Sequence, residues 1–145
     1  MIGAGFSGLA VVHALRSAGF EDFLVLERAG EIGGTWRDNT YPGIACDVPS
    51  HLYSLSFAPN PDWERAFSGG AQIWKYMRKV ARELRMNEVT AFHEEVLDAS
   101  WDEHHQLWRI RTTTLVLSAE VIIDGSGALS GPAYPAIDGL DRFHG

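Results

Sequence analysis

The sequence has little cysteine, no long apolar run and no excess of basic residues. Cys46 is the single cysteine among 145 residues, which excludes an internal disulfide and a metal site built from several cysteines and favours a reducing, cytoplasmic setting. No stretch approaches the roughly 20 apolar residues of a membrane span, and no secretory signal is visible at the start. Acidic residues outnumber basic ones by 19 to 12, giving a net charge of −7. We therefore expect neither nucleic acid nor a membrane as a partner.

The composition is typical of a folded globular protein. Hydrophobic residues make up 46% and charged residues 21% of the chain. The length corresponds to one domain or to a piece of one.

Apolar spacing predicts an α/β fold. Helical periodicity covers residues 6–18 and 71–84. Short apolar runs, which are typical of buried parallel strands, cover residues 23–27, 89–92 and 121–124. We expect a Rossmann-like parallel sheet with flanking helices.

A small antiparallel β-meander is expected in the second half of the chain. Leu97, Ala99 and Trp101 alternate with polar residues, as do Trp108 and Ile110 after a polar turn, which predicts a hairpin with Trp101 and Trp108 packed together. A third strand could follow at 115–117. Residues 30–68 form a long loop-rich region, and the tail 131–145 is expected to be irregular.

The chain opens with a G-x-G-x-x-G pattern formed by Gly3, Gly5 and Gly8. Such glycines permit a tight turn in which backbone amides approach a pyrophosphate, and the following helix points its N-terminus at the same anion. Glu27 follows 19 residues after Gly8 at the end of a predicted strand, where its carboxylate can accept a hydrogen bond from a ribose hydroxyl. Only Met1 and Ile2 precede the motif, so the first, central strand is expected to be largely missing and the chain to be truncated.

Glu27 does not by itself separate NAD from FAD, because both carry an adenosine ribose. A second glycine pair in Gly33-Gly34-Thr35-Trp36 permits another close approach to a long ligand. The turn Asp124-Gly125-Ser126-Gly127 ends an apolar run where a chain can return beside a cofactor. These features favour a flavoprotein over a dehydrogenase with one Rossmann unit, which stays an alternative.

With these motifs the sequence resembles the class B flavoprotein monooxygenases, namely the Baeyer–Villiger monooxygenases and the flavin-containing N- and S-oxygenating enzymes. The resemblance spans essentially the whole chain. Its most specific parts are Gly33-Gly34-Thr35-Trp36-Arg37, Tyr41-Pro42-Gly43 and the block from Cys46 to Tyr53. Residues 1–145 would then be a fragment of the FAD-binding domain, without the NADPH-binding domain.

The resemblance implies roles for individual residues. Gly3, Gly5 and Gly8 would hold the FAD pyrophosphate, with Phe6 and Ser7 of the same turn also in contact with the cofactor. Glu27 would hold the ribose. The remaining expected cofactor contacts are Thr35 and Trp36 on the flavin side, Gly34 and Tyr53 at the FAD, Asp47 near the isoalloxazine and Val96 at the adenine. Asp47 is also the expected catalytic residue, because in family members it helps to orient a catalytic arginine.

The resemblance also implies the reaction. NADPH reduces the flavin, O2 adds to give a C4a-peroxyflavin, and one oxygen atom passes to a small-molecule ketone or to a heteroatom substrate. Baeyer–Villiger oxidation of ketones is the leading interpretation. The alternatives are N- or S-oxygenation, and a fragment with no catalysis of its own.

Several other polar residues have simpler interpretations. His104 and His105 lie in a polar turn without a partner cluster, so a metal site is not expected. His51 and Cys46 are interpreted as structural residues, although His51 could act as a base near the flavin. The basic residues of the second helix are expected to form a solvated face; they are Lys75, Arg78, Lys79, Arg82 and Arg85.

Overall fold

A narrow parallel sheet forms the centre of the computed structural model, which describes residues 1–128 and 130–144. Strands β1 (Val25–Glu27) and β2 (Thr90–Phe92) pair in parallel. Ile2 bridges Leu26 on one side and Asp124 on the other, both in parallel. The segment before the first glycine turn therefore lies in the middle of the sheet, which is the place of the first strand in a doubly wound fold.

The predicted strand at 121–124 is wrong in extent. Within the described residues, this segment joins the sheet through the single bridge at Asp124. The amide of Ile2 donates to the carbonyl of Ile123 and the amide of Gly125 donates to the carbonyl of Ile2, both at 2.9 Å. Because the neighbouring segment is only Met1–Ile2, too few residues face one another to form a longer ladder.

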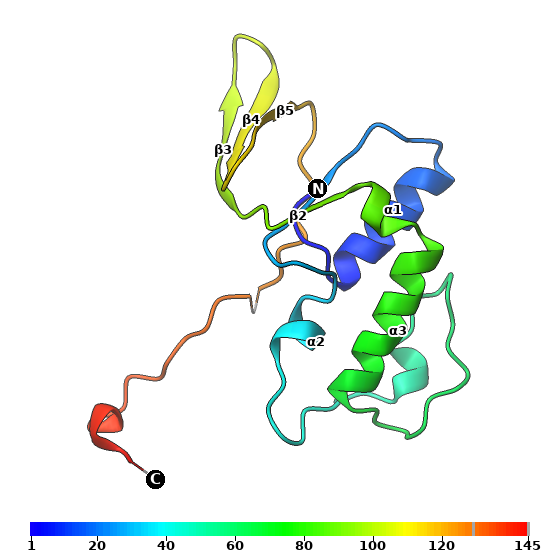
Figure 1. Cartoon of the computed structure of the whole chain (residues 1–145), viewed down its shortest axis with the longest axis vertical. Coiled ribbons are helices and arrows are strands. Elements are labelled where there is room, and N and C mark those ends of the chain that lie inside the picture. Colours follow the sequence, from blue (N-terminus) through cyan, green and yellow to red (C-terminus); the bar gives the residue numbers. More distant parts are fainter. Residues whose placement is uncertain (129, 145) are drawn as a thin grey trace.

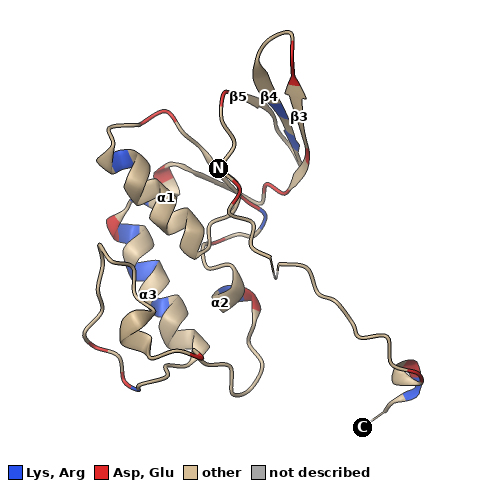
Figure 2. Cartoon of the chain, turned by 180° about the vertical axis from the view of Figure 1, so that it is seen from behind, with Lys and Arg blue, Asp and Glu red and all other residues tan. Residues whose placement is uncertain are grey.

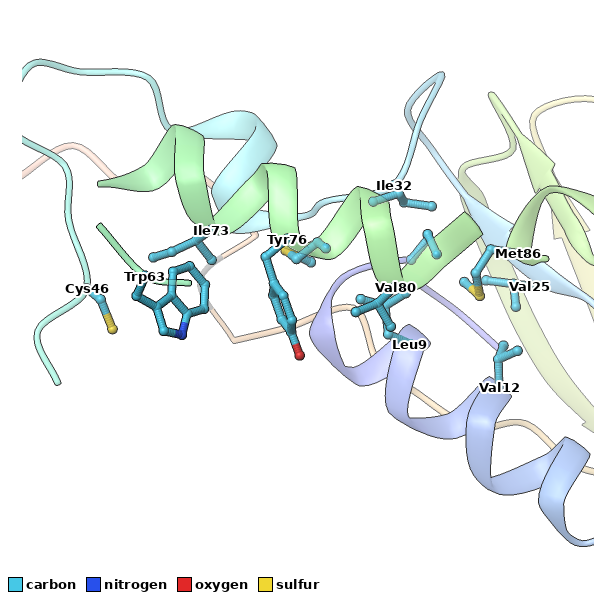
Figure 3. Packing of buried hydrophobic residues seen from close by; sticks show 13 residues of the cluster. Leu9, Val12, Val25, Ile32, Cys46, Trp63, Ile73, Tyr76, Val80 and Met86 are labelled. Carbon is cyan, nitrogen blue, oxygen red and sulfur yellow. The ribbon is translucent and has the colours of Figure 1, made fainter. Parts of the chain in front are cut away.

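Two helices pack together over the sheet and form most of the core (Figures 1 and 3). Helix α1 (Phe6–Ser17) buries Leu9 and Val12, and α3 (Gly70–Glu83) buries a stripe that includes Ile73, Met77 and Val80. This spacing of three and four residues puts the apolar side chains on one helix face. Both helices lie within one residue of the predicted bounds.

The region 30–68 contains little regular structure, as predicted, but it is well anchored. Its short elements are α2 (Thr35–Asp38) and a 3₁₀ turn at Ser50–Leu52. The amide of Cys46 donates to the carbonyl of Ser68, and the amide of Ser68 donates to the hydroxyl of Ser50. Cys46 is buried and not part of a disulfide. Figure 3 shows Cys46 and Trp63 at the far end of the same core.

The antiparallel meander stands to one side of the helices (Figure 1). It comprises β3 (Val96–Asp102), β4 (Leu107–Thr112) and β5 (Val116–Ala119) in that order. Trp101 lies opposite Trp108 with ring centroids 5.6 Å apart, which confirms the predicted aromatic pair. Further 3₁₀ turns cover Met86–Glu88 and Leu140–Arg142, the latter within a tail that extends away from the body.

Charged residues are scattered along the described chain, apart from the basic residues along α3 (Figure 2). Those side chains are mostly exposed, as expected of a solvated helix face. None of the helices described combines the length and the apolar character that crossing a membrane requires. The described residues also contain no cluster of three or more groups suited to a metal ion.

Candidate cofactor-binding site

A cavity of about 700 Å³ opens where the sheet, α1, α2 and the meander meet. Its size lies in the range of pockets that enclose whole cofactors. The opening glycine turn, the end of β1, the glycine pair before α2, the start of β3 and the second glycine turn all contribute to its wall. Of the residues expected from the sequence, ten line it: Gly3, Gly5, Phe6, Ser7, Glu27, Gly34, Thr35, Trp36, Tyr53 and Val96.

Glycine is required where the two glycine turns touch. Gly3 has a φ of +93°, and a Cβ added there would lie 2.6 Å from the carbonyl oxygen of Gly125. A Cβ at Gly8 would lie 2.6 Å from the carbonyl oxygen of Gly3. Gly8 therefore does not line the cavity but allows α1 to pack directly against the turn that does.

Helix α1 presents its N-terminus to this cavity. Gly5 is the N-cap, and no side chain caps the first turn. The first N–H groups of a helix have no partner within the helix and carry a partial positive charge. Phe6 and Ser7 in the first turn line the cavity, so this end of the helix offers backbone donors suited to an anion.

A second wall comes from the glycine pair before α2. A Cβ on Gly34, whose φ is +50°, would lie 3.3 Å from the Cα of Gly5, so the two backbones meet closely. The indole of Trp74 on α3 donates to the carbonyl of Ile32 at 3.0 Å. The same indole leaves no space for a side chain on Gly33. Trp74 thus holds the glycine pair against the opening turn.

Glu27 is buried at the end of β1 and connects these parts. Its Oε2 accepts from the amide of Ala4 at 2.8 Å, and its Oε1 accepts from the amide of Ala29 at 2.9 Å. The guanidinium of Arg37 lies 3.1 Å from Oε1. The acid therefore lies directly beside the opening turn and faces the same cavity, as the sequence interpretation requires.

Three aromatic side chains form another part of the wall. Tyr53 packs edge-on against Phe6 and Trp36, with ring centroids 5.0 and 5.6 Å apart. The indole nitrogen of Trp36 donates to the hydroxyl of Tyr53 at 3.1 Å. The cluster gives this part of the cavity an aromatic lining.

Asp47 is not among the described residues that line the cavity. It is exposed in the loop that follows the buried Cys46, and it does not line the cavity wall. Its expected place beside the isoalloxazine stays a prediction. His51 is also exposed and away from the cavity lining, and His105 is hydrogen-bonded to Asp102 in its exposed turn.

Sequence reasoning gave no role to several residues of the cavity, above all to Arg37. Its side chain is only 10% exposed and contacts both Glu27 and Asp38. Burial opposes the charge, but the hydrogen bonds and charges of Asp38 and Glu27 outweigh it and raise the pKa of Arg37. The signal in the sequence was its position directly after the Gly-Gly-Thr-Trp block.

Glu94, another lining residue without a predicted role, ties the meander to the sheet. Its amide donates to the carbonyl of Glu27 at 2.9 Å. Its carboxylate accepts from the hydroxyl of Thr112 at 2.5 Å and from the hydroxyl of Thr114. These hydrogen bonds lower the pKa of Glu94 below its ordinary value.

We expect Glu94 to make folding sensitive to acid. A carboxyl group whose pKa is lowered by folding contributes stability above its ordinary pKa of 4.5, and this contribution is lost as the pH falls through the folded-state value. The unfolding free energy of Glu94→Gln should therefore lie below that of the wild type at about pH 6 and approach it as the pH falls below the lowered folded-state pKa. Urea titrations across this range measure the difference.

Thr112→Val gives a second arm for this test, because it removes one of the donors that lower the pKa of Glu94. It should flatten the acid dependence in the same way. A difference between wild type and Glu94→Gln that stays constant with pH would contradict the assignment.

Comparison with known proteins gives matches in both sequence and fold. A family model described as an NAD(P)-binding Rossmann-like domain matches residues 1–69. The chain is 51% identical over 145 residues to a Baeyer–Villiger monooxygenase of Streptomyces coelicolor, covering 100% of this chain and 28% of that protein. The chain thus spans little more than a quarter of that relative's length.

Solved structures show the same fold. OTEMO in complex with FAD and NADP matches with a TM-score of 0.88 and 28% identity, over 98% of this chain and 28% of that one. Cyclohexanone monooxygenase from Rhodococcus sp. Phi1, bound to NADP+, matches with a TM-score of 0.86 and 32% identity, over 99% of this chain and 28% of that one. In sequence and in fold, the chain is therefore similar to a part of these monooxygenases.

Proposed function

We propose that this chain forms the FAD-binding part of an NADPH- and O2-dependent monooxygenase. The observation that carries the proposal is the hydrogen bond from the amide of Ala4 to Glu27 at the wall of the large cavity. It brings a carboxylate for a ribose and a glycine turn for a pyrophosphate to one place. The ribose and the pyrophosphate are neighbouring groups in FAD.

The residues of the cavity fit the parts of this cofactor. The free amides at the start of α1, with Gly3, Gly5 and Gly8 permitting the approach, suit the pyrophosphate. Glu27 suits the adenosine ribose, and Val96, which also lines the cavity, is assigned to the adenine.

The flavin end of the cofactor is assigned to the aromatic wall of the cavity. Phe6, Trp36 and Tyr53, next to Gly34 and Thr35, suit a flat ring. When bound, the flavin supplies the redox and oxygen chemistry, and these residues bind it, orient it and exclude water from one side.

The proposed reaction is the oxygenation of a ketone to an ester. Support comes from the names of the relatives, a Baeyer–Villiger monooxygenase and a cyclohexanone monooxygenase. We assign NADPH as the reductant because two solved relatives are complexes with NADP. Since the chain spans 28% of the relatives' length, we place the nicotinamide site outside the described residues. The buried free thiol of Cys46 is compatible with a cytoplasmic location.

Equilibrium binding followed by flavin fluorescence tests the proposal. FAD should bind one per chain and at least about a hundredfold more tightly than FMN, because FMN lacks the adenosine ribose and the second phosphate that Glu27 and α1 are proposed to hold. Binding of NADP+ is measured in parallel, as the test of a nicotinamide-binding site. Equal affinity for FAD and FMN, or binding of NADP+ without FAD, would overturn the assignment.

A further inference from the structure

Arg37 lies at a junction of three parts of the chain. Its Nη1 donates to Glu27 Oε1 at 3.1 Å and to the carbonyl of Glu31 at 2.5 Å. Its Nε and Nη2 donate to the two carboxylate oxygens of Asp38 at 2.8 and 3.0 Å. A guanidinium carries five N–H donors in a rigid fork. Acceptors within the described residues take four of them, so Arg37 is held in a single orientation.

Most of the hydrogen-bond acceptor positions of the Glu27 carboxylate are already occupied. A carboxylate offers about four acceptor positions, two on each oxygen. Oε1 accepts from Ala29 and from Arg37, while Oε2 accepts from Ala4 alone among the described residues. One acceptor position is thus free, on Oε2.

We propose that Arg37 is a positioning residue that makes Glu27 an acceptor for one ribose hydroxyl only. The inference rests on the proposed FAD site and deepens it. One hydroxyl of the adenosine ribose donates to Glu27 Oε2, and the other receives no partner from this carboxylate. Arg37 sets this selectivity because it occupies the second position on Oε1.

The fork between Asp38 and Glu27 explains why an arginine is suited to this task. Two parallel hydrogen bonds to Asp38 fix the plane of the guanidinium, and Nη1 is then directed at Glu27. A lysine at this position keeps the charge but has no planar fork. An uncharged residue frees a position on Oε1 and lets the carboxylate accept a hydroxyl from either side.

The test compares how strongly the wild type and Arg37 variants bind ligands that lack one ribose hydroxyl or the other. The ligands are FAD and its two analogues that lack the 2′ or the 3′ hydroxyl of the adenosine ribose. With the wild type, one analogue should bind about tenfold or more weakly than FAD and the other within about twofold, as expected for one hydrogen bond to a charged group. With Arg37→Met the ratio between the two analogues should fall below about threefold, and Arg37→Lys should be intermediate.

The ratio separates positioning from a general structural role, because a loosened fold weakens all three ligands equally. Arg82→Met, which changes an exposed arginine on α3, is the matched control and should keep the wild-type ratio. Equal losses for both analogues in the wild type, or an unchanged ratio in Arg37→Met, would overturn the inference. If circular dichroism shows Arg37→Met unfolded, Arg37→Lys decides, and an unchanged ratio there is the contrary result. Failure of the wild type to bind FAD rejects the proposed function instead.

Discussion

Gly3→Ala should destabilise the protein by about 3 kcal/mol and abolish FAD binding. An alanine at a φ of +93° costs about 1–2 kcal/mol through its backbone conformation. The added Cβ would also lie 2.6 Å from the carbonyl oxygen of Gly125, and such overpacking costs about 1–3 kcal/mol more. Because the Cβ position is fixed by the backbone and its neighbour is a backbone oxygen, no side-chain rotation relieves the contact. Urea unfolding and flavin fluorescence measure the two effects.

Gly19→Ala is the matched control for this substitution. Gly19 has a φ of +82°, and no described atom outside its chain neighbours lies within 4 Å of an added Cβ. It carries the conformational cost of about 1–2 kcal/mol without the clash and lies away from the cavity lining. If Gly3→Ala and Gly19→Ala lose the same stability and both retain FAD, the close contact between the two glycine turns is not required.

Glu27→Ala should cost about 3 kcal/mol of unfolding free energy, the second large effect. The substitution leaves the amides of Ala4 and Ala29 without their acceptor and leaves the buried Arg37 with Asp38 as its only carboxylate among the described residues. Breaking a buried pair by removing one partner costs about 3–5 kcal/mol. We expect a loss at the lower end of this range because Arg37 keeps its contact to Asp38. Chemical denaturation measures the change in unfolding free energy.

An exposed pair on the same protein provides the comparison. Glu88 pairs with Arg85 at the surface, with about half of the Glu88 side chain exposed. Glu88→Ala should change stability by less than about 1 kcal/mol. Similar losses in Glu88→Ala and Glu27→Ala would show that burial does not determine the contribution of Glu27.

The spacing of apolar residues along the sequence was sufficient to predict the helices and strands in which that spacing is regular. The apolar spacing of α1 and α3 gave both helices, because one buried stripe on each determines how it packs. The glycine pattern and Glu27 gave the core of the site, because strand, turn and helix follow one another within 27 residues. The aromatic pair of the hairpin followed from alternation alone.

Other features depend on contacts that a linear pattern does not contain. The roles of Arg37 and Glu94 arise from acceptors that come from separate segments, so no spacing signals them. The extent of the segment 121–124 depended on how much chain lies beside it, not on its own apolar residues. The expected role of Asp47 stays a prediction, since Asp47 does not line the cavity.

The meeting of the two glycine turns has a consequence for biosynthesis. Gly3 and Gly125 touch across more than a hundred residues of chain, and Ile2 bridges Leu26 of β1 on one side and Asp124 on the other. Gly3 and Gly125 are 122 residues apart in the sequence, so the opening turn lacks this contact until residue 125 has been synthesised. The part of the cavity wall that the two turns form together is therefore completed only after residue 125 has left the ribosome.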